Sequence, residues 1–182
     1  MTVRCAISLV AAAALAGCVV NGVRPLAGTA SGSRGDRAVV VVGITVAGAW
    51  RYPQFGVILD QYDRAQQRIT GDCFSYNRIE AVVAAVPAPT RFLAFEVPAG
   101  DYVYSAFNTA RFAGNDQAFQ AGPGHAVYVG NFALGDNGVV TLRSDLAADR
   151  VAIAQALPRL AAGLEMAHAV TVVPASPFLC TP

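Results

Sequence analysis

Short runs of β-branched and aromatic residues, separated by turn-forming Gly, Pro, Asn and Asp, fill the chain from Ala38 onward. This texture is typical of an all-β domain, because such side chains pack well on a pleated surface and turn residues end each run. Residues 39–46 (VVVVGITV) are apolar on both faces of a strand, which predicts a central strand covered on both sides. We therefore expect a mainly β fold, an antiparallel β-sandwich.

Further strands are predicted over 55–59, 68–76, 92–97, 102–107, 125–132, 139–143 and 167–173. Residues 79–86 leave helix and strand both open, since their alanines favour a helix and their valines a strand. The sequence Pro98-Ala99-Gly100-Asp101 is typical of a turn, so we expect 92–107 to form a hairpin. Two more turns, at 122–124 and 135–138, precede later strands.

One helical segment is predicted near the C-terminus and is expected to pack on the sandwich. Ser144 or Asp145 can cap it, and it should run to Ala156. Pro158 should interrupt it, because proline lacks the amide hydrogen that a continuous helix uses. The apolar side chains that form its buried stripe are Leu146, Ile153, Leu157 and Leu160.

The N-terminus has the pattern of an export signal. Arg4 precedes an apolar run, residues 6–16, whose length fits a signal peptide and falls short of the roughly 20 residues needed to cross a bilayer. The run ends in Leu15-Ala16-Gly17-Cys18, which resembles the lipobox of bacterial lipoproteins. That resemblance implies cleavage before Cys18, acylation of Cys18 and a membrane anchor. The alternative is a buried N-terminal helix that contains a cysteine.

The expected organisation has three parts. Residues 1–17 are the signal peptide, and residues 18–37 are the lipidated cysteine and a flexible tether rich in Gly, Ser and Arg. Residues 38–182 are long enough for one domain. Val19 follows the cysteine where lipoproteins of the inner membrane often carry Asp, so the resemblance favours the outer membrane.

Two cysteines remain once Cys5 leaves with the signal and Cys18 is acylated. Cys73 and Cys180 would then face an oxidising compartment as an isolated pair, which predicts a disulfide bond. The alternative is two thiols that do not pair.

Residues 97–102 (VPAGDY), followed by 122–124 (GPG) and 127–132 (VYVGNF), resemble uncharacterised bacterial lipoproteins with a small transthyretin-like β-sandwich. The resemblance covers about a third of the mature chain and implies the fold. It implies little about function, because sandwiches of this kind carry many unrelated roles.

The charged residues exclude some partners. The chain carries 13 basic and 12 acidic residues, a net charge of +1, and they are spread evenly, so we expect no nucleic-acid partner.

His125 and His168 stand in no zinc-binding spacing, and no metal or cofactor is expected. Asp60 and Asp63 could ligate a hard cation, but they lack a calcium-loop pattern and are expected to face water.

No catalytic residue is predicted. Ser144, His125 and Asp145 could be combined into a triad, yet the chain lacks a Gly-x-Ser-x-Gly elbow, and adjacent Ser144 and Asp145 suit a helix cap better. The candidate binding surface is Trp50, Arg51, Tyr52 and Phe55, because aromatic rings beside an arginine are typical of binding hot spots. The alternative is that these rings belong to the core or its rim.

These patterns together predict a lipid-anchored protein of the cell envelope, attached to the membrane through its N-terminal lipid. We expect it to bind a protein or cell-wall partner. We expect a binding protein rather than an enzyme. The competing hypothesis is an envelope hydrolase acting on peptidoglycan or lipid. A third hypothesis is a subunit of an envelope complex.

Overall fold

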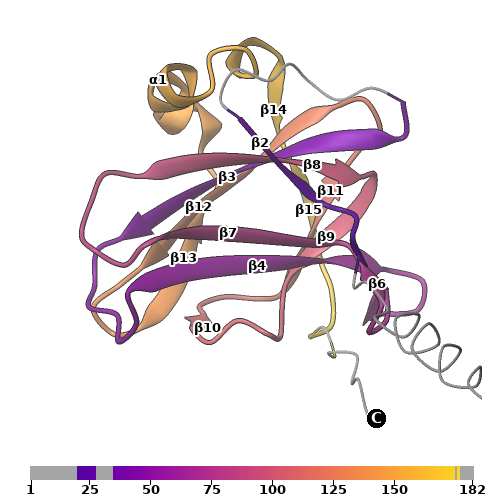
Figure 1. The fold of residues 1–182 in the computed structure, drawn as a ribbon, viewed down its shortest axis with the longest axis horizontal. Coiled ribbons are helices and arrows are strands. Elements are labelled where there is room, and N and C mark those ends of the chain that lie inside the picture. Colours follow the sequence, from indigo (N-terminus) through magenta and orange to yellow (C-terminus); the bar gives the residue numbers. More distant parts are fainter. Residues whose placement is uncertain (1–19, 28–34, 175, 177–182) are drawn as a thin grey trace, which may run out of the picture.

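Strand β3 (Arg37–Val46) lies at the centre of the fold, as its run of valines predicts. Residues 38–44 of this strand are all buried, and their side chains alternate between two separate hydrophobic clusters. One cluster fills the space between two sheets, and the other lies under the C-terminal helix (Figure 1). The prediction of a strand covered on both faces is confirmed.

The computed structural model describes residues 20–27, 35–174 and 176. The remaining elements, in chain order, are β1 (Val20–Asn21), β2 (Arg24–Leu26), β4 (Gln54–Asp63), β5 (Arg68–Ile69), β6 (Ser75–Tyr76), β7 (Arg78–Ala84), β8 (Arg91–Pro98), β9 (Gly100–Tyr104), β10 (Arg111–Phe112), β11 (Gln117–Ala121), β12 (Ala126–Leu134), β13 (Val139–Arg143), α1 (Leu146–Ala156), the 3₁₀ turn η2 (Ala161–Gly163), β14 (Leu164–Met166) and β15 (His168–Thr171).

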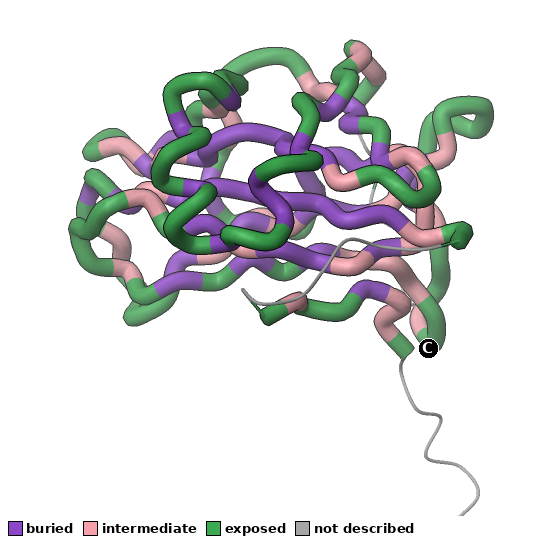
Figure 2. The backbone as a smooth tube through the Cα atoms, turned by 90° about the horizontal axis from the view of Figure 1, so that it is seen from above, coloured by how far each residue is buried: buried purple, intermediate pink, exposed green. Residues whose placement is uncertain are grey.

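Two sheets pack face to face (Figure 1). The first has the order β10-β13-β12-β3-β8-β2, with β14 also paired to β12. The second has the order β15-β11-β9-β4-β5, with β7 also paired to β4. A separate two-stranded ladder joins β1 to β6. The buried backbone runs through the middle strands, while exposed segments are mostly turns and loops (Figure 2).

The mainly β fold class is confirmed, but the sandwich is not purely antiparallel, because the short pairs β1–β6, β10–β13 and β12–β14 are parallel as well as a pair at the centre. The central pair β3–β12 is parallel and contains a register shift between Tyr128 and Gly130. Gly130 has a φ of 136°, and a Cβ there would lie 2.7 Å from the Leu142 side chain. Glycine is therefore required at this irregularity.

The C-terminal helix α1 agrees with its prediction. The Asp145 side chain accepts a hydrogen bond from the Ala148 amide at 2.9 Å, and the helix ends at Ala156, two residues before Pro158. The predicted stripe is buried, with exposed fractions of 8 % or less at Leu146, Ile153, Leu157 and Leu160. The helix covers the outer face of the first sheet, where Tyr128 donates a hydrogen bond to Asp149 at 2.7 Å.

The hairpin predicted for 92–107 was wrong. β8 and β9 belong to different sheets, and only Ala99 separates them. The reason is that both edges of β8 are already occupied, because Glu96 pairs with Val39 of β3 on one side and Arg24 of β2 on the other. The turn sequence instead carries the chain from one sheet to the other.

Two other segments differ from or refine their predictions. Residues 68–76 form two short strands, β5 and β6, because a turn at Asp72 interrupts them; the Asp72 carboxylate accepts the amides of Phe74 and Ser75. Residues 79–86, for which helix and strand were both open, belong mostly to strand β7. Its burial alternates, with Ile79, Ala81 and Val83 buried and Glu80, Val82 and Ala84 exposed, which is the period of a strand with one face on the core.

Residues 20–27 differ from the flexible tether expected over 18–37. β1 pairs with β6 and β2 pairs with β8, while Val23 between them is only 7 % exposed and packs into the main core. Arg37 also donates to the Gly22 carbonyl at 2.8 Å. The composition of this segment is linker-like, but apolar Val23 and the open edge of β8 bring it into the fold. No helix among the described residues is long and apolar enough to cross a membrane.

Candidate functional site

The predicted binding surface lies in the loop between β3 and β4, and its four members have different environments. Phe55, the second residue of β4, is 1 % exposed and belongs to the main core, so it is not a surface residue. Trp50 is half-buried and packs edge-on against Phe55, with ring centroids 5.4 Å apart. Tyr52 and Arg51 are exposed. We call Trp50, Arg51 and Tyr52 the aromatic rim.

The aromatic rim is held together by ring contacts. The Tyr52 ring packs edge-on against Trp50 at 6.2 Å between centroids, and the Arg51 guanidinium lies 4.8 Å from the centre of the Tyr52 ring. Because Phe55 fixes Trp50 from below, the rim presents a supported aromatic surface with a positive charge above it. Such a surface can stack on a sugar ring or receive an apolar or acidic side chain of a protein.

A small apolar hollow opens at the same end of the sandwich as the aromatic rim. The Ala85 amide donates to the Pro53 carbonyl at 3.0 Å, which joins the end of β7 to the rim loop. The hollow has a volume of about 60 Å³ and is lined by Ile44, Val46, Val83, Val86, Pro89 and Arg91. It is far smaller than a typical pocket for a small molecule, which is about 300 Å³ or more. A protruding side chain of a partner would fit it better.

A buried ion pair lies near the opposite end of β4. Asp60 is 1 % exposed and pairs across the sheet with Arg78 of β7, with Nε–Oδ1 at 2.7 Å and a second contact at 3.3 Å. The Ser105 hydroxyl also donates to Asp60. We call Asp60, Arg78 and Ser105 the Asp60 cluster. Its Asp60 was expected to face water, and that expectation was wrong.

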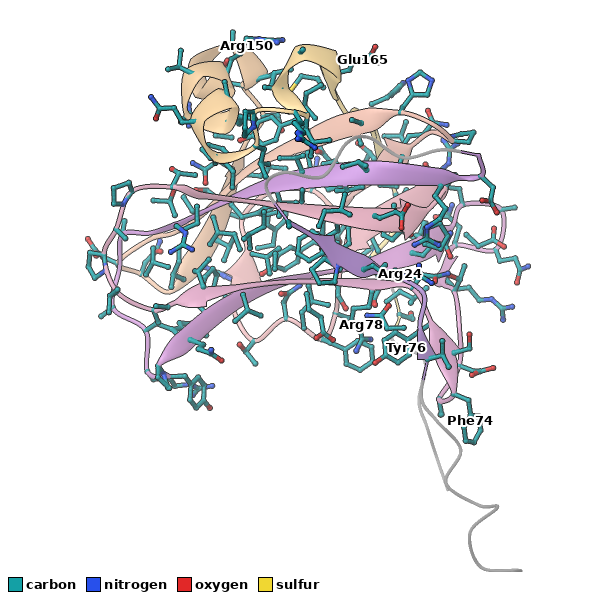
Figure 3. All side chains as sticks on the ribbon, turned by 45° about the horizontal axis from the view of Figure 1, so that its top comes forward. Arg24, Phe74, Tyr76, Arg78, Arg150 and Glu165 are labelled. Atoms are coloured by element: carbon teal, nitrogen blue, oxygen red, sulfur yellow. The ribbon has the colours of Figure 1, made fainter. Side chains whose placement is uncertain are left out.

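Aromatic rings and the N-terminal strand enclose the Asp60 cluster. The Arg78 guanidinium lies 4.5 Å from the centre of the Phe107 ring and 5.0 Å from that of Tyr76. Asn21 of β1 accepts the Arg78 amide at 3.0 Å and donates to the Arg78 carbonyl at 2.8 Å. Figure 3 shows Arg78 and Tyr76 side by side at the edge of the ribbon. The cluster therefore connects β1 rigidly to the second sheet.

The Asp60 cluster is arranged for stability. Asp60 receives three hydrogen bonds, and the Ser105 oxygen that donates to it also accepts the Phe107 amide at 3.1 Å. Ser105 is 2 % exposed, so its oxygen is not presented to a substrate. A paired and hydrogen-bonded carboxylate of this kind holds strands together, since removal of either charge would leave the other buried and unpaired.

A cavity of about 300 Å³ adjoins Ser105, and its polar lining includes Tyr104, Asn108 and Asp116. The Asn108 side chain bonds the backbone of Ile58 through both its oxygen and its nitrogen, at 2.9 and 2.8 Å. The Tyr104 hydroxyl donates to the Ala110 carbonyl at 3.0 Å, and burial raises the pKa of this tyrosine. The cavity thus has the size of a ligand pocket, while the Asn108 amide and the Tyr104 hydroxyl in its lining bond to the protein backbone.

The structure does not bring Ser144, His125 and Asp145 together as a catalytic triad. Ser144 directly follows β13 and lies beside Gly130, five residues from His125, which is about 16 Å along a strand. The Ser144 hydroxyl donates to the Val129 carbonyl, and Asp145 caps α1. His125 is exposed and lies 3.7 Å from Glu165, beside an open cavity of about 240 Å³.

His168 is exposed on β15, in register with Gln120. Among the residues that the structure describes, no three His, Cys, Asp or Glu side chains gather into a group that could hold a metal ion. Cys18 and Cys180 lie outside the described residues, so the lipidation site and the Cys73–Cys180 bond stay predictions. Cys73 lies between Asp72 and Phe74, two residues before β6.

Sequence reasoning missed Asp60 and Arg78 as partners. The signal that could have indicated Asp60 is its place in the apolar run FGVILD, because an acidic residue is rare within a strand. No local pattern indicates Arg78 as the other half of the pair. The two residues meet only because β4 and β7 are neighbours.

The chain matches no protein-family model, no curated protein and no solved structure. The fold and the site define a mainly β protein of two packed sheets that carries an aromatic surface at one end and a buried ion pair near the other.

Proposed function

We propose that this chain is a lipid-anchored protein of the bacterial cell envelope, non-enzymatic, whose sandwich presents the aromatic rim to a protein or cell-wall partner. The observation that carries the proposal is the placement of the rim and the N-terminal strand at opposite ends of β4. Gln54, next to the rim, pairs with Ala84, whereas Asp60 pairs with Arg78, which Asn21 of β1 binds. The ten residues of β4 span about 30 Å.

The anchor follows from the sequence together with the N-terminal strand. Cys18, the last residue of the lipobox-like pattern, stands two residues before Val20, the first residue of β1. Diacylglycerol and a further acyl chain on Cys18 would hold the protein on a membrane, since each buried CH₂ contributes about 0.8 kcal/mol. Val19 after the cysteine supports the outer membrane.

Such an anchor would leave the aromatic rim facing away from the bilayer. The rim combines a supported aromatic surface, the Arg51 charge and a small apolar hollow beside it, which are the features of a hot spot for a macromolecular partner. The competing interpretation, a hydrolase of peptidoglycan or lipid, would instead require a reactive group aimed into a cavity.

The anchor is tested by the intact mass of the protein from membrane fractions. The wild type should carry a diacylglycerol adduct on the chain that begins at Cys18, whereas the Cys18→Ala variant should retain residues 1–17 and carry none. An unmodified wild-type chain in the cytoplasm would overturn the anchoring.

The rim is tested with the same lipidated protein and purified peptidoglycan sacculi. Tyr52→Ala and Arg51→Ala should reduce cosedimentation several-fold, because each removes part of the aromatic rim. Val151→Ala is the matched control, since Val151 is a 72 % exposed apolar residue on α1. Photo-crosslinking from position 52 in cells tests the protein partner. Soluble fragments released from sacculi by wild type would favour the hydrolase instead.

A further inference from the structure

We infer that the turn before β6, together with β1, is a membrane-contacting face in which Phe74 and Val20 enter the interface of the bilayer. This inference rests on the proposed lipid anchor at Cys18. Phe74 is 65 % exposed and Val20 is 55 % exposed. The two residues are neighbours, because the Val20 amide donates to the Phe74 carbonyl at 2.7 Å. They form a pair of apolar side chains exposed to solvent at one edge of the molecule.

The turn holds Phe74 outward by specific bonds. The Asp72 carboxylate accepts the amides of Phe74 and Ser75, both at 2.8 Å, and the Asp72 amide donates to the Ser75 carbonyl at 2.8 Å. These backbone bonds lower the pKa of Asp72, so its carboxylate stays ionised and the turn stays closed. Gly71 begins the turn with a φ of 104°. In Figure 3 Phe74 points away from the sandwich, beyond Tyr76.

The length of chain between Cys18 and β1 brings this face to the bilayer. Cys18 stands two residues before Val20, and two residues of extended chain span at most about 7 Å. Because β1 is fastened to β6 by its ladder and to β7 by Asn21, there is no long tether that could hold the domain away from the lipid. The acyl chains would therefore enter the bilayer within about 7 Å of Val20, and Phe74 lies beside that point.

An exposed arginine on the same side of the molecule as the apolar pair fits a bilayer surface. Arg24 of β2 is exposed, and Figure 3 shows it on the same side of the ribbon as Tyr76 and Phe74. An exposed arginine on the side of the molecule that carries Phe74 suits the headgroup region, where the guanidinium would meet phosphates and the Phe74 ring the upper acyl chains. Asp72 remains a negative charge on this turn, bound to the Phe74 and Ser75 amides.

The experiment uses the native tryptophan as an internal reference. The chain contains one tryptophan, Trp50, in the aromatic rim at the far end of β4. The test protein is Phe74→Trp in a Trp50→Phe background, so that its only indole is at position 74. Both lipidated proteins are reconstituted into vesicles of phosphatidylethanolamine and phosphatidylglycerol, with or without brominated acyl chains, which quench tryptophan on contact.

The indole at position 74 should shift to the blue and lose emission roughly twofold in brominated vesicles, because an interfacial side chain sits at the headgroup and acyl boundary. Trp50 of the wild type should keep its emission. The Cys18→Ala form of each protein, mixed with the same vesicles, is the control for the anchor. If the double variant does not fold, slower amide hydrogen exchange over 71–76 in wild type, in vesicles relative to detergent, replaces it.

The outcomes separate the two proposals. A lipid adduct on Cys18 with no quenching at position 74, or with unchanged exchange over 71–76, overturns the membrane-contacting face and leaves the lipid anchor standing. A chain without the adduct overturns the anchor, and the membrane-contacting face with it. Equal quenching at positions 50 and 74 would also contradict the inference, since it would place both ends of β4 on the lipid.

Discussion

Arg51 and Arg78 make the same kind of contact at opposite ends of β4, and their surroundings give them different roles. The Arg51 guanidinium lies 4.8 Å from the Tyr52 ring, and that of Arg78 lies 4.5 Å from the Phe107 ring. Arg51 is exposed, whereas the Arg78 side chain is 15 % exposed and bound to a carboxylate that is 1 % exposed. Burial and Asp60 therefore distinguish a stabilising arginine from one that is available to a partner.

The largest expected effect concerns the region of Cys73, at the same end as Arg78. A Cys73–Cys180 bond closes a loop of about 107 residues, which stabilises the fold by about 4 to 5 kcal/mol in the entropic model. Cys180→Ser should lower the free energy of unfolding by that amount in urea titrations without reductant, and by far less with reductant.

The pairing itself is checked by mapping disulfide-linked peptides of the lipidated protein. Val20 and Ser75 are partners in the parallel β1–β6 ladder. Cys18 stands two residues before Val20, and Cys73 stands two residues before Ser75. Unacylated Cys18 is therefore the competitor to exclude, and a Cys18–Cys73 peptide in the lipidated protein would contradict the prediction.

The second prediction tests the two arginines directly. Arg78→Ala should lower the free energy of unfolding by about 3 to 5 kcal/mol, because it leaves the carboxylate of Asp60 buried without its charged partner. Arg51→Ala is the matched change at the exposed end and should stay within about 0.5 kcal/mol of wild type. Chemical unfolding followed by circular dichroism measures both. Equal losses in the free energy of unfolding would contradict the distinction between the buried and the exposed arginine.

The third prediction extends the comparison to buried and exposed tyrosines. The Tyr128 hydroxyl donates to Asp149, which also binds Arg143 at 2.6 Å. Tyr128→Phe should cost about 1 to 2 kcal/mol at neutral pH, because Asp149 loses a donor in a site that is 6 % exposed. Tyr52→Phe, in the aromatic rim, is the control and should have little effect.

The same tyrosine predicts a dependence on alkaline pH. Burial and Asp149 raise the pKa of Tyr128 above its ordinary value of 10.0. The stability contributed by the neutral hydroxyl is therefore fully present below pH 10 and is lost as the pH rises toward the folded pKa. Unfolding free energies measured between pH 8 and 11 should fall less steeply in Tyr128→Phe than in wild type, and parallel curves would refute this cause.

The smallest expected effect is at the exposed turn of the membrane-contacting face. The pKa of Asp72 is lowered by the Phe74 and Ser75 amides, so the turn is supported above the ordinary carboxyl pKa and loosens as the pH falls through the folded value. Amide exchange at Phe74 and Ser75 should accelerate on acidification in wild type. In Asp72→Asn this acceleration should be absent, after correction for intrinsic rates, and a persistent acceleration would assign it to another group.

Much of the fold was predictable because its signals are local. The valine run of 39–46 predicted a doubly buried strand, and Asp145 with the stripe through Leu160 predicted helix α1. Of the candidate site, Trp50, Arg51 and Tyr52 were predicted as a surface group, and the structure places them together. Phe55 was misassigned because the sequence around a loop does not show which ring points inward.

The sequence by itself indicated most of the longer strands, where the helix begins and ends, and which short pattern predicts the lipid anchor, but it did not indicate β11 (Gln117–Ala121). Only the tertiary structure decided that β8 and β9 enter different sheets, that β3 pairs in parallel with β12, and that residues 20–26 add strands to the fold. Side-chain period and turn preference act over a few residues, so they specify an element without its partner. Pairing depends on which strand edges are already occupied, and the burial of Asp60 beside Arg78 follows from that competition.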